Sequence, residues 1–128
     1  MNERGKTNFS IGLVILTVLL TVYAQVILKW RIRESGPLPI SLADKVAFLA
    51  KLLLDPGIIS GMFAAFVGGL FWMAAMTRVD LSYAYPFMSL AFVLVLFFSA
   101  ILFHEAVTVP KVLGLLLIIA GLIVASRG

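Results

Sequence analysis

The chain has 128 residues, of which 62% are hydrophobic and 12% charged, and its mean hydropathy is +1.14. A soluble domain of this size would lack polar surface, so the composition predicts one membrane domain over residues 1–128 and excludes a separate soluble catalytic domain. The net charge of +4 does not indicate a nucleic-acid partner, because the basic residues flank apolar segments, as residues at membrane interfaces do.

The first apolar segment, residues 9–28, is uncharged and long enough to cross a bilayer, so it is predicted to be the first membrane helix. Thr21 and Gln25 are among its few polar residues, and Lys29 follows directly after it. Residues four apart share one face of a helix, so these three side chains are predicted to face the interior of the protein.

Residues 36–39, Gly-Pro-Leu-Pro, cannot continue a helix, so a turn is predicted after the first span. The segment 41–54 that follows has apolar residues at helical spacing, with Asp44, Lys45 and Lys51 off that stripe. It is too short and too charged to span a bilayer. We expect an amphipathic helix lying flat in the headgroup region, and an ordinary connecting helix is the alternative.

Asp55-Pro56 is a typical helix start, with an aspartate cap and a proline in the first position, and it precedes a second span at 57–76. Small residues recur there at every fourth position and predict a groove for close helix packing: Gly57, Gly61, Ala65 and Gly69. Trp72, near the end of this span, is interpreted as an interfacial anchor or as a ligand contact.

A short connection at 77–80 predicts that the second and third spans are antiparallel neighbours, and the third span is expected at 82–103. Pro86 lies four residues after Ser82, a candidate cap, so the pattern predicts a break or bend that frees the Ser82 carbonyl. Polar side chains near this point form a strip on the predicted helix: Tyr83, Tyr85 and Ser89.

A second cap-and-proline start, Thr108-Val109-Pro110, predicts a fourth span at 109–125. Small residues on it predict a packing face, which we expect to join subunits: Gly114, Gly121 and Ala125. The predicted fold is therefore all-α, an integral membrane bundle of four transmembrane helices with a short interfacial helix between the first two. The larger number of Lys and Arg residues on the side of the first loop favours the cytoplasm for that side.

The segments SYAYPFMSLAFVLV and HEAVTVPKVLGLLLIIAGLIV resemble the last two helices of the small four-helix members of the drug/metabolite transporter superfamily. Ala24-Gln25, Lys29 and the charged first loop fit the same group, and the chain is most similar to the aminoarabinose-phosphoundecaprenol flippase subunits. The resemblance implies a multi-pass protein of the bacterial inner membrane that works as a homodimer or as a heterodimer with a paralogous subunit. It also implies transport of an undecaprenyl-phosphate-linked sugar between leaflets for lipopolysaccharide or envelope modification.

A flippase for such a lipid-linked anionic sugar, or for a similar amphiphile, must shield the phosphate and the sugar while the tail stays among membrane lipids. Under this hypothesis Lys29 pairs with the phosphate, and Glu105 meets an amine on the sugar or pairs with His104 or a lysine. The predicted substrate-binding residues are Gln25, Lys29, Tyr83, Tyr85, Ser89 and Glu105, with Thr21, Trp72, Arg78 and His104 as secondary candidates. We expect the polar groups of the first and third spans to converge on one cavity.

Simpler roles exist for the same residues. Lys29 could reach the headgroups, the tyrosines could belong to an interfacial aromatic belt, and His104-Glu105 could cap the next helix. Two other functions fit the sequence: an exporter of cationic compounds, which is disfavoured because the first span lacks the acid of small multidrug-resistance transporters, and a non-transporting scaffold subunit. An enzyme, a cofactor and a metal site are not predicted, since the chain has no cysteine and no nucleophile beside a base.

Overall fold

The computed structural model describes residues 3–127, and this part of the chain is all-helical, without a strand. Its five helices are α1 (Glu3–Glu34), α2 (Leu42–Leu53), α3 (Pro56–Met76), α4 (Leu81–Leu102) and α5 (Val109–Arg127). Three of them, α1, α3 and α4, are long and apolar enough to cross a membrane, and α5 contains a shorter apolar segment, Val109–Ala125. The predicted all-α class is confirmed, and the chain is a multi-pass membrane protein.

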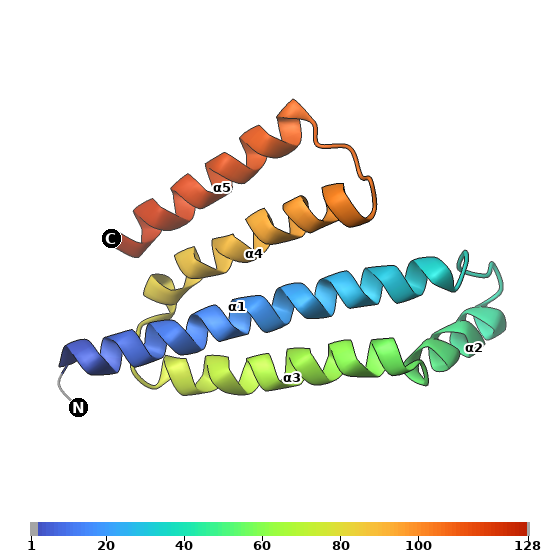
Figure 1. Cartoon of the computed structure of the whole chain (residues 1–128), viewed down its shortest axis with the longest axis horizontal. Coiled ribbons are helices and arrows are strands. Elements are labelled where there is room, and N and C mark those ends of the chain that lie inside the picture. The colour runs from blue at the N-terminus through green and yellow to red at the C-terminus, as the bar shows by residue number, and fades with distance from the viewer. Residues whose placement is uncertain (1–2, 128) are drawn as a thin grey trace.

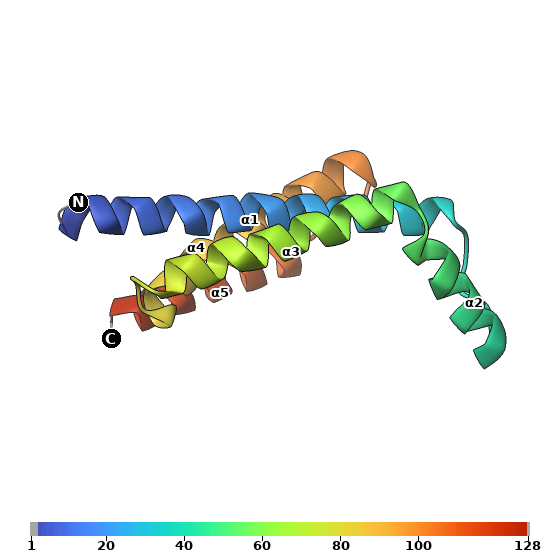
Figure 2. The same ribbon diagram turned by 90° about the horizontal axis from the view of Figure 1, so that it is seen from below.

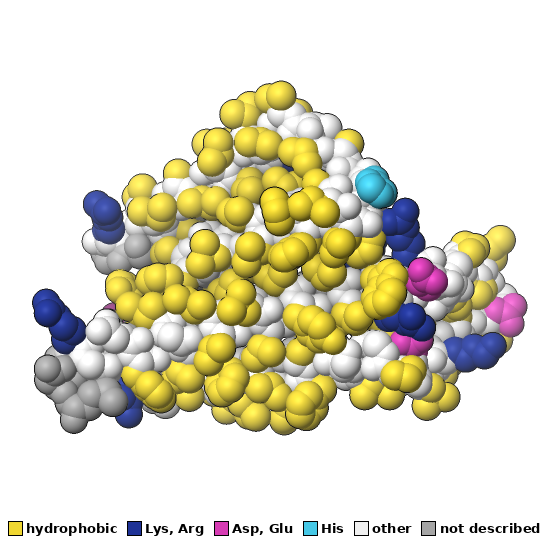
Figure 3. All heavy atoms as spheres, viewed as in Figure 1, with side chains coloured by type: hydrophobic (Ala, Val, Ile, Leu, Met, Phe, Trp, Pro, Cys, Tyr) yellow, Lys and Arg dark blue, Asp and Glu magenta, His cyan; other side chains and the backbone are white. Residues whose placement is uncertain are grey.

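Helix α1 is the centre of the fold. It packs against α3 on one side and α4 on the other, and α5 packs against α4 (Figure 1). The helices α1 and α4 run in one direction, and α3 and α5 run in the other. Figure 2 shows α2 turning away from the other helices at the far end of α1. Hydrophobic side chains cover the middle of the face seen in Figure 3 and charged side chains lie toward its two ends, as expected of membrane-spanning helices.

The predicted helix starts at residues 55 and 108 are confirmed. The Asp55 carboxylate accepts hydrogen bonds from the backbone N–H groups of Gly57 (2.8 Å) and Ile58 (3.2 Å), with Pro56 in the first position of α3. The Thr108 hydroxyl accepts a bond from the Lys111 N–H at 3.4 Å. These starts were predictable because the sequence alone determines a side-chain cap followed by proline.

Helix α4 begins differently from the prediction. It starts at Leu81, directly after Asp80, so Ser82 lies inside the helix and is not its cap. The helix also continues through Pro86 without interruption, so the predicted helix break is wrong, although the Ser82 carbonyl loses its helical donor as predicted. Pro86 lies in the second turn of α4, where only a few helical residues precede it and can clash with its ring. The carbonyl that lacks a helical donor is that of Ser82, which is exposed at the end of the helix.

Glycines on α3 allow α1 to approach closely. A Cβ atom at Gly61 would lie 2.6 Å from Ile27 Cγ2 and 3.4 Å from the Ala24 carbonyl oxygen. The small residues that α3 buries are Gly61, Ala64, Gly68 and Ala75. Their spacing of three, four and seven follows the 3.6-residue turn, whereas a strict spacing of four drifts around the helix.

Beyond Gly61 the predicted spacing of four takes no part in the contact between α1 and α3, and its use against another subunit stays a prediction. Ala65 and Gly69 are exposed, and a Cβ atom at Gly69 would have nothing within 4 Å. Gly121 and Ala125 on α5 are exposed as well, and Gly114 is half-buried. Their use in contacts with another subunit stays a prediction.

Two polar side chains connect α1 and α3 in addition to the glycine contacts. The buried hydroxyl of Thr17 lies 2.9 Å from the Leu13 carbonyl oxygen and 3.1 Å from the Gly68 carbonyl oxygen. The hydroxyls of Tyr23 and Ser60 are 2.9 Å apart. Hydrogen bonds of this kind across helices add to packing within a bilayer, so α1 and α3 form the most firmly joined pair of the fold.

An ion pair joins the last turn of α1 to the start of α3. Arg31 Nε and Nη2 donate to the two carboxylate oxygens of Asp55 at 3.0 and 2.7 Å. Gly57 leaves room for this arrangement, since a Cβ atom there would lie 2.6 Å from Arg31 Cγ. The hydrogen bond from Arg31 is the main cause of a pKa of Asp55 below its ordinary 3.8; burial raises that pKa, and the N–H groups of Ile58 and Gly57 lower it further.

We expect the stability that Asp55 contributes to be lost at acidic pH. Because its pKa is lower in the folded protein, this stability is complete above the ordinary value of 3.8 and is lost as the pH falls through the folded value. Asp55→Asn should thus be less stable than wild type near neutral pH, and the difference should shrink at about pH 3. Detergent unfolding measured across this range tests the expectation, with Asp44→Asn in α2 as control. A difference that stays constant with pH would contradict it.

Candidate functional site

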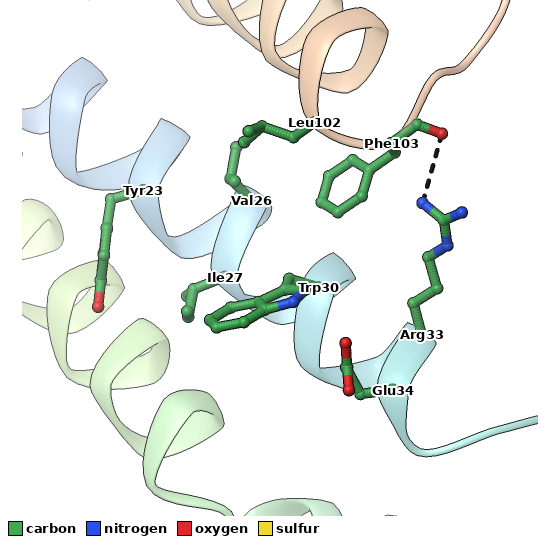
Figure 4. A pocket seen from close by; sticks show the side chains of 8 residues that line it. All are labelled: Tyr23, Val26, Ile27, Trp30, Arg33, Glu34, Leu102 and Phe103. Atoms are coloured by element: carbon green, nitrogen blue, oxygen red, sulfur yellow. Dashed lines mark hydrogen bonds between the residues drawn. The ribbon is translucent and has the colours of Figure 1, made fainter.

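A cavity of about 760 Å³ lies where the C-terminal part of α1 meets the end of α4 (Figure 4). Its walls are formed by Tyr23, Val26, Ile27, Trp30, Arg33, Glu34, Leu102 and Phe103. The α1 residues recur at intervals of three and four, so one helical face provides most of the lining. Figure 4 shows the rings of Trp30 and Phe103 on two sides of the cavity, with Arg33 and Glu34 at one end.

The charged end of the cavity contains a guanidinium and a carboxylate. Arg33 Nη1 donates to the Phe103 carbonyl oxygen at 3.3 Å, and the guanidinium lies 5.6 Å from the centre of the Phe103 ring. Within residues 3–127, Glu34 makes no ion pair and no side-chain hydrogen bond. It acts electrostatically on Arg31, whose donors already bind Asp55. The cavity therefore offers unused donors on Arg33 and an unused carboxylate on Glu34.

An apolar groove of about 320 Å³ adjoins this cavity between α1 and α4. Its lining consists of Leu19, Val22, Tyr23, Val26, Leu94, Phe98 and Leu102. It shares Tyr23, Val26 and Leu102 with the charged cavity, so the two spaces adjoin along the helices. Together they can accommodate a ligand that has a charged head and an apolar chain.

A sharp corner after α4 brings Glu105 to α1. His104 has a φ of 54°, in the left-handed region, and the backbone N–H of Glu105 donates to the Ser99 carbonyl oxygen at 3.2 Å. This turn places Glu105 Oε1 3.8 Å from Lys29 Nζ. The sequence predicted that Glu105 meets an amine on the sugar or pairs with His104 or a lysine. The structure shows the pair with a lysine.

We expect neutral replacements of Lys29 or Glu105 to leave the fold intact. Their side chains are 56% and 42% exposed, and ion pairs at such positions contribute about 0–1 kcal/mol. Lys29→Gln and Glu105→Gln should each change the free energy of unfolding in detergent by less than about 1 kcal/mol. A larger change would contradict this expectation. Loss of transport by these stable variants would identify a functional role for the pair, and retained transport would identify a merely structural contact.

Gln25 and Lys29 lie on one face of α1, as predicted, but both are exposed, so this face does not point to the interior of the chain as expected. The Gln25 side chain has no hydrogen bond to another described residue. Thr21, one turn earlier, is half-buried. This face lies beside the cavity rather than in its lining, which consists of the neighbouring positions of α1.

The predicted residues of the third span lie at the other end of the molecule. Tyr85 contacts Trp72 edge to face, with 5.7 Å between the centres of the two rings. Trp72 packs on a buried cluster that contains Val14. Tyr83 contacts Phe87. Ser89 is buried and donates a hydrogen bond to the Pro86 carbonyl oxygen.

The structure therefore separates the predicted site residues into two groups. Val14 and Lys29 are fifteen positions apart on α1, about 22 Å at roughly 1.5 Å per residue. Arg78 also lies far from the cavity, with its guanidinium 5.5 Å from the Phe9 ring. The predicted convergence of the first and third spans on one cavity is wrong within this chain, and the residues brought together are Lys29 and Glu105.

Sequence reasoning missed the residues that carry charge and aromatic surface into the cavity, namely Trp30, Arg33, Glu34 and Phe103. The first span was expected to end at residue 28, but α1 continues to Glu34. A search for helical spacing beyond the basic residues would have found the face formed by residues 23, 26, 27, 30, 33 and 34.

Residues 6–127 match the EamA-like transporter family along nearly the whole chain. The chain belongs to this family. The resemblance to the drug/metabolite transporter superfamily is thereby confirmed, and this EamA-like chain is also similar to several curated proteins. No solved structure shows significant similarity to it.

One relative of this EamA-like chain, from Pseudomonas aeruginosa, is named a probable 4-amino-4-deoxy-L-arabinose-phosphoundecaprenol flippase subunit, ArnE. It is 32% identical over 123 residues, covering 92% of this chain and 97% of the relative. ArnE of Aeromonas salmonicida is 34% identical over 109 residues, or 85% and 90% of the two chains. A probable ArnF subunit of the same flippase, from an Enterobacter species, is 32% identical over 111 residues, or 85% and 87%.

Proposed function

We propose that the chain is a subunit of a flippase that moves an undecaprenyl-phosphate-linked amino sugar across the bacterial inner membrane, for lipopolysaccharide or envelope modification. The relatives' names specify an amine, a sugar, a phosphate and a long prenyl chain. The observation that carries the proposal is the charged cavity that adjoins an apolar groove between α1 and α4. A headgroup fits the first space and the beginning of the prenyl chain fits the second.

In this proposal α5 is the fourth transmembrane helix. Its 19 residues extend about 28 Å at roughly 1.5 Å per residue, close to the ~30 Å of a bilayer core. Helix α2 lies at the interface, where Lys45 and Lys51 reach lipid phosphates. The exposed small residues Gly121 and Ala125 on α5 form the contact with a second subunit, either another copy or a paralogue.

The two separated polar groups then mark the two ends of the transport path. At one end Arg33 binds the phosphate, with Gln25, Lys29 and Glu105 beside the cavity. At the other end the tyrosines of α4 receive the sugar. The exposure of Tyr83 and Tyr85 supports this role, because an exposed tyrosine can form hydrogen bonds with a ligand through its hydroxyl.

Reconstitution tests the proposal. Proteoliposomes that contain the chain should accelerate the transfer of a labelled polyprenyl phosphate amino sugar between leaflets, measured as reaction of its amine with a membrane-impermeant reagent. Empty liposomes are the control. Transfer at the rate of empty liposomes, both by the chain alone and after addition of a paralogous subunit, would contradict the proposal. Transport of a cationic dye in its place would favour the exporter function, since Glu34 is an acid in the cavity.

A further inference from the structure

We propose that Glu34 is the residue that selects lipid-linked sugars carrying a free amine, while Arg33 binds their phosphate. The inference rests on the proposed function and assigns substrate specificity to one carboxylate of the cavity. It concerns the preference between two headgroups of different charge, a property that the comparisons with relatives do not assign to any residue.

Glu34 is the last residue of α1. Its carboxylate is at the charged end of the cavity near Trp30, as Figure 4 shows, and it has no hydrogen-bond or ion-pair partner among the described residues. A carboxylate beside an aromatic ring is a suitable environment for an ammonium group, which gains both a charge-assisted hydrogen bond and a cation–π contact.

The neighbouring cations could occupy Glu34 or repel an ammonium, but they have other partners. Both donor groups of Arg31 that bind a carboxylate are directed to Asp55, at 3.0 and 2.7 Å. Lys29 pairs with Glu105 on an adjacent face of α1. Arg33 is directed toward Phe103, through its carbonyl oxygen and its ring. The carboxylate of Glu34 is therefore left for a ligand.

The lining of the cavity contains one positive and one negative side chain next to each other in the sequence. Arg33 and Glu34 are consecutive on α1, and consecutive helical residues project about 100° apart, so their charged groups diverge at one end of the cavity. A headgroup with a phosphate and an ammonium can neutralise Arg33 with the phosphate and Glu34 with the ammonium. A headgroup whose amine is acylated satisfies Arg33 only and gives the exposed Glu34 carboxylate no charge-assisted hydrogen bond, so it binds less tightly.

Binding measured by fluorescence tests this inference separately from transport. In a Trp72→Phe background, quenching of Trp30 would report binding of a short-chain polyprenyl phosphate amino sugar or of its N-acetylated form. We expect the amine form to bind about tenfold more tightly, the effect of one hydrogen bond to a charged group. Glu34→Gln should remove this preference by weakening the amine form alone, whereas Asp44→Asn in α2 should retain it.

The possible outcomes separate the two proposals. Equal binding of both probes by the wild type, or equal weakening of both by Glu34→Gln, would overturn the role of Glu34 and leave the flippase proposal standing. If neither probe bound, the role of Glu34 would be overturned as well. Failure of the proteoliposome assay with intact, amine-dependent binding would overturn the flippase proposal alone. Unfolding of Glu34→Gln in detergent serves as the control for its fold.

Discussion

Replacement of Gly61 by alanine is expected to destabilise the protein by about 1–3 kcal/mol, the usual cost of adding a group to a filled space. The new Cβ atom would lie 2.6 Å from Ile27 Cγ2 and 3.4 Å from the Ala24 carbonyl oxygen. Neither atom can yield easily, because a β-branched side chain in a helix has one strongly preferred rotamer and the carbonyl belongs to the backbone. The two helices would have to separate.

Gly69→Ala is the matched control for this substitution. It makes the same chemical change in the same helix, but a Cβ atom at Gly69 has nothing within 4 Å. Both variants gain the higher helix propensity of alanine, so the difference between their free energies of unfolding in detergent measures the packing effect. Equal stability of the two variants would show that α1 and α3 do not approach each other at Gly61 as described.

Replacement of Arg33 by glutamine is expected to lower flippase activity at least about tenfold, the effect of losing one hydrogen bond to a charged group. Its guanidinium is the cation at the charged end of the cavity, and only part of its donor set is used by the Phe103 carbonyl oxygen. Arg33→Lys should have an intermediate activity, because an ammonium keeps the charge without the planar pair of donors that fits a phosphate.

Arg127→Gln controls for a general effect of removing positive charge, since Arg127 lies in the last turn of α5. Leaflet transfer in proteoliposomes gives the activity, and unfolding in detergent shows whether the loss of the contact with Phe103 has changed the fold. Full activity of a folded Arg33→Gln variant would exclude Arg33 as the phosphate-binding residue.

Much of the secondary structure could be predicted because its determinants are local. The long apolar segments and the Asp55-Pro56 and Thr108-Pro110 starts depend on neighbouring residues only. The end of α1 was less predictable. Basic residues after position 28 suggested a loop, yet long charged side chains can extend to the membrane surface from a continuing helix, and the first residue with a positive φ is Gly36, at 87°.

The site required information about the packing of distant segments. Local patterns gave the face of Gln25 and Lys29 but not the rotation of α1 against α4, which places the neighbouring face with Trp30 and Arg33 in the cavity. The separation of Tyr85 from Lys29 could have been deduced from topology. Because α1 and α4 run in the same direction, the start of α4 lies near the start of α1, away from its last turns.

At the cavity end of the molecule, α1 is joined to α3 and to the end of α4 by different kinds of contact. Glycine packing and cross-helix hydrogen bonds fix α3 to α1, whereas the corner after α4 is attached to α1 by the exposed Lys29–Glu105 pair and by Arg33. Leu102 and Phe103 lie at this corner and form one wall of the cavity. A displacement of this corner alone would thus widen or narrow the chamber while the contacts between α1 and α3 stay unchanged.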